Sequence, residues 1–400
     1  MKNKKQNKRR HKKPYRKQEK NIFIPKLRVF EAFAGIGAQH SALKRLGINF
    51  EISGISDWFI DAIECYAAIH HENDVVTVPQ QKENVLKYLE RMTFSKDSVH
   101  PCKLGSLSED DLRDLYRSNK KCKNIGSILD IKPEEMPPTD LLVYSFPCQD
   151  LSTGGLGKGM KKGSGTRSGL LWEVERILNG LKDLNRLPEY LLLENVRTIK
   201  SDSNINDLNQ WLAFLEKLGY QNDDCMFLNA LDFGVPQDRE RAFIVSHLGE
   251  KLNIPEKIKS RMRPREYRFE DFFRNDYNNP TLKSEADKAQ LNKTPSREKM
   301  WEINGRELNA NTIVRTITCN MDRTHCAALF PYNGVKGDSY RRPTIREAFL
   351  LMGFTEEEYE RTLSLDYSYR KMNKLIGNSI VVNVLVAIFD SMFGDKYKCR

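Results

Sequence analysis

The sequence predicts an α/β fold in which helices cover both faces of a doubly wound, mostly parallel sheet, with a smaller domain inserted late in the chain. Two observations support this. From residue 27 onward, short apolar runs alternate with amphipathic stretches, as in repeated strand–helix units. The alternation stops across 250–340 and gives way to one last periodic segment at 342–393.

The apolar runs and the helical periodicity give the individual elements. The expected strands are 27–33, 50–55, 140–146, 190–194, 225–230 and 241–247. The expected helices are 37–46, 58–70, 168–183 and 206–218. The polar stretch at 72–125 predicts an insertion that contains helices at 82–92 and 108–118. The expected domains are therefore 25–250 together with 341–400, and a second domain at 251–340.

The N-terminal arm, residues 1–24, is a separate basic segment. Its first 20 residues hold eleven Lys or Arg and one acid, Glu19, so they carry +10 of the net charge of +11. Such a segment is too polar to pack a core, and we expect it to be disordered. It is either a solubilising tail or a device for non-specific attachment to phosphates.

Composition excludes several classes of protein. No run approaches the roughly 18 apolar residues that span a bilayer, and the basic N-terminus lacks the apolar core of a secretory signal, so a cytoplasmic protein without a membrane partner is expected. The eight cysteines show no C-x-x-C spacing. Neither a disulfide framework nor a metal site is therefore predicted.

A glycine-rich turn follows the first strand, at 33–37, and the second strand ends near Asp57. Glycines at a strand–helix turn let the backbone approach a ligand, and a carboxylate at the tip of the next strand can accept hydrogen bonds from ribose hydroxyls. Trp58 could cover an adenine. This pattern fits a nucleotide, a flavin or S-adenosylmethionine, and it also fits a purely structural turn.

Reactive side chains are expected at the ends of later strands. Cys148 follows the strand at 140–146, where side chains point into the crevice of an α/β sheet. Glu194 ends an apolar strand, where a carboxylate is either hydrogen-bonded or held as a proton donor. Arg239 and Arg241 lie two residues apart at a strand start, so they point the same way, as suits gripping a phosphate or a base edge.

In this order and spacing, these motifs resemble the cytosine-5 DNA methyltransferases. The resemblance rests on the 33–37 turn, Asp57-Trp58, Asp130-Ile131, Pro147-Cys148-Gln149, Glu194-Asn195-Val196, Gln237-x-Arg239-x-Arg241, Arg342-Pro343-Thr344-x-Arg346-Glu347 and Gly377-Asn378-Ser379. It implies a Rossmann-like methyltransferase sheet with a target-recognition domain at 251–340. The stretches 144–152 and 165–172 look like those of the mollicute-type branch that methylates CG sites.

The resemblance implies a catalytic role for each reactive residue. Cys148 would add to C6 of a flipped cytosine and activate C5 for methyl transfer from S-adenosylmethionine. Glu194 would bind the exocyclic amine and N3, where charge develops. Arg241 would bind O2 of the cytosine. Arg239, grouped with them, would support the site or the nearby backbone.

The resemblance also implies a cofactor site for S-adenosylmethionine. Asp130 with Ile131 would address the adenine edge, although counting back from Cys148 without gaps places Ser127 there instead. The full set of expected cofactor residues is Phe33, Gly35, Ile36, Gly37, Asp57, Trp58, Asp130, Ile131, Pro147, Leu170, Asn378 and Ser379.

The implied partner is double-stranded DNA, from which the target base is flipped. The segment 150–168, rich in glycine and lysine, has the composition of a loop that closes over the site. The residues expected to contact DNA are Gln149, Ser152, Gln237, Arg306, Arg315, Thr316, Thr318, Asn320 and Arg323.

Three other functions stay open. They are a transfer-RNA cytosine-5 methyltransferase, a nicotinamide-linked oxidoreductase that uses the same glycine turn, and a non-catalytic DNA-binding relative. A companion restriction endonuclease, solitary modification and a phage origin are all compatible with the sequence. We expect a bacterial or phage-encoded monomer, because one base is flipped in each event.

Overall fold

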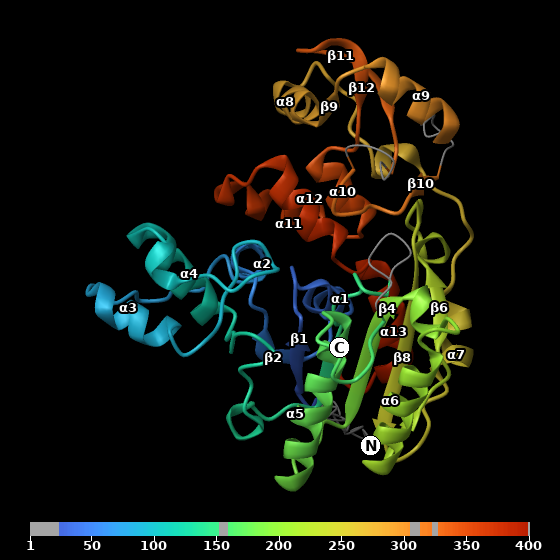
Figure 1. Cartoon of the computed structure of the whole chain (residues 1–400). Coiled ribbons are helices and arrows are strands. Elements are labelled where there is room, and N and C mark those ends of the chain that lie inside the picture. The colour runs from blue at the N-terminus through green and yellow to red at the C-terminus, as the bar shows by residue number, and fades with distance from the viewer. Residues whose placement is uncertain (1–23, 152–158, 305–312, 322–326, 399–400) are drawn as a thin grey trace, which may run out of the picture.

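The computed structural model describes residues 24–151, 159–304, 313–321 and 327–398 (Figure 1). The predictions for the basic arm up to residue 23, and for Ser152, Arg306 and Arg323, lie outside the described residues.

A seven-stranded sheet forms the centre of the described chain, with the order β2-β1-β3-β4-β8-β5 and with β6 paired to β8. Its strands are β1 (Leu27–Ala32), β2 (Phe50–Ser56), β3 (Leu141–Tyr144), β4 (Tyr190–Val196), β5 (Tyr220–Asn222), β6 (Met226–Asn229) and β8 (Glu240–Leu248). The first four run parallel, whereas β8 is antiparallel to β4, β5 and β6. The doubly wound α/β prediction is confirmed, with an antiparallel edge added to it.

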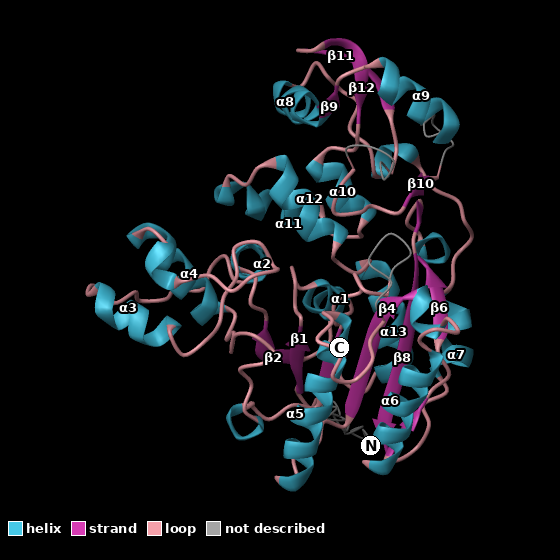
Figure 2. Ribbon diagram, in the orientation of Figure 1, coloured by secondary structure: helices cyan, strands magenta, loops and turns pink. Residues whose placement is uncertain are grey.

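Helices cover both faces of this sheet (Figure 2). They are α1 (Ala38–Arg45), α2 (Ile60–His70), α5 (Leu171–Asp183), α6 (Ile205–Lys217) and α13 (Val382–Phe393). Along β3, Leu141 and Val143 belong to the core with α1, α2 and α13, while Leu142 and Tyr144 belong to the core with α5 and α6. Successive side chains of a strand point to opposite faces, so an all-apolar strand serves two cores.

The expected insertion packs against the β2 side of the sheet and carries α3 (Lys82–Leu89) and α4 (Glu109–Lys121). Helix α4 begins at a capping box, in which the Ser108 side chain accepts from the Asp111 N–H and the Asp111 carboxylate accepts from the Ser108 N–H. Leu112 and Leu115 of α4 are buried in the same core as α2. The insertion is therefore a structural part of the main domain.

A smaller antiparallel sheet, β11-β12-β9, forms the upper part of the molecule in Figure 1. Its strands are β9 (Gln290–Leu291), β11 (Phe330–Gly334) and β12 (Gly337–Arg341). Two helices belong to the same region, α8 (Pro280–Ala289) and α9 (Pro295–Asn304). This sheet falls in the region of the second domain predicted at 251–340, whose bounds stay a prediction. Its expected start at 251 differs from the structure, because Ile254 of α7 (Ile254–Lys257) and Ile258 are buried in the main core, in contact with α13.

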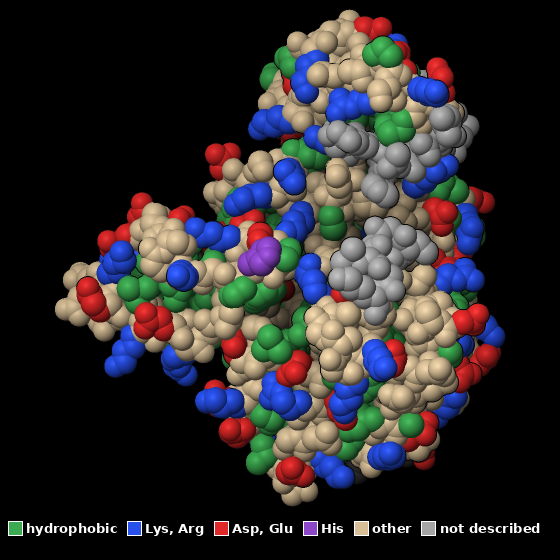
Figure 3. Space-filling model, viewed as in Figure 1, with side chains coloured by type: hydrophobic (Ala, Val, Ile, Leu, Met, Phe, Trp, Pro, Cys, Tyr) green, Lys and Arg blue, Asp and Glu red, His purple; other side chains and the backbone are tan. Residues whose placement is uncertain are grey.

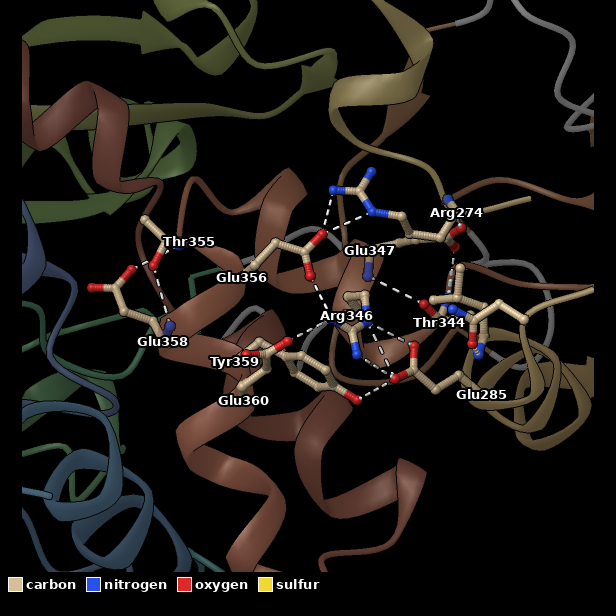
Figure 4. A network of polar contacts seen from close by, with 12 residues as sticks. Arg274, Glu285, Thr344, Arg346, Glu347, Thr355, Glu356, Glu358, Tyr359 and Glu360 are labelled. Atoms are coloured by element: carbon tan, nitrogen blue, oxygen red, sulfur yellow. Dashed lines mark hydrogen bonds and ion pairs between the residues drawn. The ribbon is translucent and has the colours of Figure 1, made fainter. Parts of the chain in front are cut away.

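Buried ion pairs join this smaller sheet to α10 (Ile345–Leu351) and α11 (Glu356–Arg361). Arg346 binds Glu285 of α8 at 2.9 Å and also Glu356 (Figure 4). Arg341 of β12 pairs with Glu347 of α10 at 2.8 Å, and both side chains are fully buried. Charges buried this deeply must be paired, which fixes how the two parts meet.

One stretch of the described residues, Tyr369–Phe393, is long and apolar enough to span a membrane. It consists of two helices, α12 (Tyr369–Gly377) and α13, separated by residues 378–381. Most of this apolar stretch is buried inside the protein, so it belongs to the core of the fold.

Candidate active site

A cavity of about 340 Å³ opens at the carboxyl ends of β1 to β4. Ligands bind at this edge in α/β sheets because the strand–helix turns converge there. On the face shown in Figure 3, Lys and Arg side chains gather along the hollow between the main domain and the upper sheet. Of the residues predicted for cofactor binding, the cavity is lined by Phe33, Gly35, Ile36, Asp57, Trp58, Pro147, Leu170, Asn378 and Ser379.

Asp57 shapes the turn after β1. One carboxylate oxygen accepts from the Gly35 N–H at 2.9 Å, and the other accepts from the Phe59 N–H at 2.9 Å. Burial raises the pKa of Asp57 to about 6, while these backbone hydrogen bonds hold it down. Each carboxylate oxygen keeps a further lone pair, so Asp57 can still accept hydrogen bonds from a ligand's hydroxyls.

Gly37 does not line the cavity, contrary to its predicted cofactor contact. Its backbone is left-handed, with φ at 76°, and a Cβ there would lie 2.4 Å from Nε2 of His70. That nitrogen is hydrogen-bonded to the Ile36 carbonyl at 3.0 Å, and burial keeps the pKa of His70 well below its usual range. A neutral His70 therefore donates to the turn, and the glycine makes room for α2.

Asp130 and Ile131, predicted for cofactor binding, are also not among the residues that line the cavity. The Asp130 carboxylate accepts from the Thr93 N–H at 2.7 Å and from the Thr93 hydroxyl at 3.1 Å, so it fastens the insertion to this segment. The residues at the cavity are Ser127, Ile128 and Leu129. Counting back from Cys148 without gaps leads to Ser127, which is one of these residues.

The segment that carries Cys148 is held by hydrogen bonds on both sides. Asn195 donates from Nδ2 to the Phe146 carbonyl at 3.0 Å, and the Ser168 hydroxyl donates to the Pro147 carbonyl at 2.6 Å. The Asp150 carboxylate accepts from the Arg167 N–H at 2.8 Å. Sequence reasoning missed Asp150 and Ser168. Their only signal was a pair of polar residues at the two ends of a glycine-rich segment.

Cys148, Glu194 and Arg241 line the same cavity. In the register of β4 with β8, Arg241 pairs with Val196 and Phe243 pairs with Glu194, so Arg241 and Glu194 are diagonal neighbours on one face. The Arg241 Nε lies 3.7 Å from a Glu194 oxygen. This distance leaves both groups able to turn toward a ligand.

Burial sets the protonation of two of these groups. It raises the pKa of Glu194, although the two nearby arginines act in the opposite direction. Burial also raises the pKa of the Cys148 thiol, helped by the Glu194 charge and opposed by Arg241 and Arg239. The resting cavity therefore favours a neutral thiol beside a carboxyl group that retains its proton more readily than usual.

Arg239 is only 4% exposed, and the main chain occupies its guanidinium. Its Nη1 donates to the Ile317 carbonyl at 2.8 Å, and its Nη2 donates to the carbonyls of Gly377 at 3.1 Å and Ser379 at 2.7 Å. Arg239 thus ties β8 to two distant segments that border the cavity. The sequence grouped Arg239 with the catalytic residues. Its contacts in the structure are those of a residue that positions the backbone around the cavity.

Gln237, predicted to contact DNA, is fully buried in the structure. Its Nε2 donates to the Leu351 carbonyl at 2.6 Å, and its Oε1 accepts from the Ile317 N–H at 3.0 Å. Two strands flank this contact, β7 (Gln237–Asp238) and β10 (Val314–Arg315), which pair in parallel. The glutamine is therefore used to satisfy buried backbone groups.

The remaining predicted DNA contacts of the described chain lie at the cavity or in residues 315–320, which begin at the end of β10. Arg315 and Asn320 are exposed, and the half-buried Thr316 and Thr318 donate to the carbonyls of Asp238 at 2.7 Å and Asn320 at 2.9 Å. Gln149 lines the cavity, and its side-chain oxygen is buried without a hydrogen-bond partner within the described residues. A buried acceptor of this kind requires a partner that a ligand can supply.

Comparisons with known proteins agree with this geometry. The family model of C-5 cytosine-specific DNA methylases matches residues 91–394. The chain is 38% identical to the orphan methyltransferase M.SssI of Spiroplasma monobiae, over 92% of this chain and 98% of the relative. It is 33% identical to the Type II methyltransferase M2.ScrFI of Lactococcus lactis subsp. cremoris, over 92% and 99% respectively.

Solved structures share the fold. The crystal structure of the S. pombe Dnmt2 methyltransferase matches with a TM-score of 0.56 and 19% identity, over 92% of this chain and 98% of that one. A likeness at this identity concerns the fold alone, whereas the family match covers most of the chain. The chain therefore belongs to the C-5 cytosine-specific DNA methylases and is a DNA cytosine-5 methyltransferase.

Proposed function

We propose that Cys148 is the nucleophile of this methyltransferase and attacks C6 of a cytosine flipped out of duplex DNA. The observation that carries the proposal is the meeting of Cys148, Glu194 and Arg241 in one cavity, each from the end of a different strand. The bond from the Cys148 sulfur to C6 pushes an electron pair toward C5. After methylation a water molecule or hydroxide takes the C5 proton, and the electron pair of the C5–H bond re-forms the C5–C6 double bond and expels the Cys148 thiolate.

Glu194 and Arg241 handle the charge of the attacked ring. With its raised pKa, Glu194 can hold a proton and donate it toward N3, where negative charge develops. Arg241 donates to O2 of the base. Burial raises the pKa of Cys148, so the thiol must pass its proton to a base such as water for the sulfur to attack C6.

S-adenosylmethionine is the methyl donor we propose for the same cavity, where it supplies the electrophilic methyl group. The residues fit such a ligand. Asp57 offers acceptors for ribose hydroxyls, and Phe33 and Trp58 offer ring faces for an adenine. Pro147, Leu170, Asn378 and Ser379 line the same cavity, and we assign the place beside the adenine to Ser127 rather than to Asp130.

DNA would enter between the main domain and the upper sheet. The domain predicted at 251–340, with its start moved beyond the α7 region, would read the target sequence, and segment 150–168 would close over the flipped base. We propose that the exposed residues Arg315 and Asn320 and the cavity residue Gln149 take part in these contacts. A CG target is proposed from the resemblance of 144–152 and 165–172 to the CG-methylating branch.

The cellular setting follows from the relatives, which include bacterial and phage proteins. We propose a cytoplasmic monomer that modifies DNA either as the partner of a restriction endonuclease or alone. The names of the relatives include both kinds, Type II and orphan methyltransferases.

The test is to incubate the full chain with labelled S-adenosylmethionine and mixed-sequence duplex DNA, and to map 5-methylcytosine at base resolution. Cys148→Ala is expected to abolish labelling while donor binding stays. The matched control is Cys225→Ala, because Cys225 is half-buried away from the cavity and its loss should leave labelling intact. Labelling of RNA alone, or persistent labelling by Cys148→Ala, would contradict the proposal.

A further inference from the structure

Two apolar side chains at the cavity are unusually exposed. Val99 is 49% exposed and Leu129 is 61% exposed, yet both line the cavity. Leu129 comes from the segment before β3, and Val99 comes from the insertion. Apolar groups that converge on one opening indicate a surface that a ligand covers.

Val99 belongs to a tight turn, residues 97–100. The Asp97 carboxylate accepts from the N–H groups of Val99 at 2.7 Å and His100 at 2.8 Å, and Ser98 adopts a left-handed backbone with φ at 63°. The turn is thus closed by its own hydrogen bonds.

The turn sits directly on the wall predicted for the adenine and ribose. The Ser95 N–H donates to the Trp58 carbonyl at 2.7 Å, and the Ser95 carbonyl accepts from the Ile60 N–H at 3.0 Å. These bonds attach the chain entering the turn to the end of β2, next to Asp57. These backbone hydrogen bonds therefore hold this part of the insertion at the edge of the cavity.

Two basic side chains hold the turn from the other side. Arg167 donates from Nη2 to the Ser98 carbonyl at 2.7 Å. Lys374 of α12 donates to the Asp97 carbonyl, and its ammonium lies 4.6 Å from the centre of the Phe59 ring. Arg167 follows the Cys148 segment, so the turn links the adenine wall to the nucleophile side of the cavity.

We propose that the turn 97–100 forms the outer wall of the methyl-donor site, where Val99 together with Leu129 covers bound S-adenosylmethionine and Arg167 holds the turn in place. This inference rests on the donor site proposed above. It gives the insertion, for which sequence motifs supplied no function, a role in retaining the donor.

The experiment measures the Kd of S-adenosylmethionine for the full chain by calorimetry without DNA. Val99→Ser is expected to raise Kd roughly tenfold, because two methyl groups lose their contact with the ligand. Val99→Ile keeps an apolar side chain and should bind the donor as tightly as the unmodified chain. The matched control is Val75→Ser, since Val75 lies in the same insertion but is 95% exposed and away from the cavity.

A second variant, Arg167→Met, tests the support of the turn and should raise the donor dissociation rate several-fold. The unfolding temperature without donor should stay unchanged in Val99→Ser, since the side chain is largely exposed. If the unmodified chain, Val99→Ser and Arg167→Met all bind the donor equally well, the role proposed for the turn 97–100 is contradicted, whereas the proposed donor site is not. If the unmodified chain does not bind the donor, both the donor site and the role of the turn are contradicted.

Discussion

The Asn195 side chain donates to the Phe146 carbonyl at 3.0 Å, which joins the end of β4 to the backbone two residues before Cys148. The same side chain accepts from the Val196 N–H at 2.9 Å. The strand that carries Glu194 thereby helps to position Cys148, the proposed nucleophile. Asn195 is a positioning residue for the proposed reaction.

Asn195→Ala is expected to lower kcat by about tenfold or more, because the thiol is no longer held in line with its target. It should also cost about 1–3 kcal/mol of stability, since a buried carbonyl loses its donor. Steady-state kinetics and denaturant unfolding measure both. Asn222→Ala is the control, because Asn222 binds the Leu212 carbonyl at the far edge of the sheet. It should leave kcat unchanged, and equal kcat losses would contradict the assignment.

Donor binding should depend on pH through Asp57. Its pKa is raised to about 6 by burial, so the carboxylate gains a proton as the pH falls through 6 and accepts hydrogen bonds less well. The Kd for S-adenosylmethionine is expected to be constant above that pH and to rise below it. Asp57→Asn should bind weakly and lose this dependence. A dependence that persists in Asp57→Asn would assign it to another group.

Gly37→Ala is expected to destabilise the protein by more than about 3 kcal/mol, because the new methyl group would collide with the His70 ring. Gly47→Ala should cost only about 1 kcal/mol from backbone strain. Gly47 has a similar φ of 64°, but a Cβ at this position would meet no atom within 4 Å. Urea unfolding of both variants compares them. Equal losses would show that the close approach to α2 is unimportant.

Breaking the Arg341–Glu347 pair should cost about 3–5 kcal/mol in Arg341→Met, because a fully buried carboxylate loses its counter-charge. The double variant Arg341→Met with Glu347→Gln should recover much of this loss. Glutamine keeps an acceptor for the Thr344 N–H, which Glu347 now binds at 2.8 Å. A double-mutant cycle of unfolding free energies measures the coupling, and purely additive losses would refute it.

Local sequence predicted the elements that bury apolar side chains on both faces. The first four strands of the sheet follow from runs such as 140–146 and 190–194, and α5 and α6 follow from their 3.6-residue period. The direction of β8 was not predictable, because an apolar run reads the same in either direction. Residues 230–239 connect β6 to β8 and bring the chain back antiparallel.

The candidate site was predictable where a residue type has a distinctive task, as at Cys148 and Asp57. It was not predictable where a polar side chain serves the backbone. Gln237 and Asp130 look like ligand contacts in the sequence, and only their partners in the fold reveal that they satisfy buried N–H and carbonyl groups. Val99 gave no signal, because its contribution depends on where the insertion folds back.

The Arg239 contacts also make the cavity depend on the C-terminal part of the chain. The three carbonyl partners of Arg239 belong to residues 317, 377 and 379. An unpaired buried charge is costly. A chain that ended after β8 would lack all three acceptors of this guanidinium, and we expect such a truncated protein not to form the cavity.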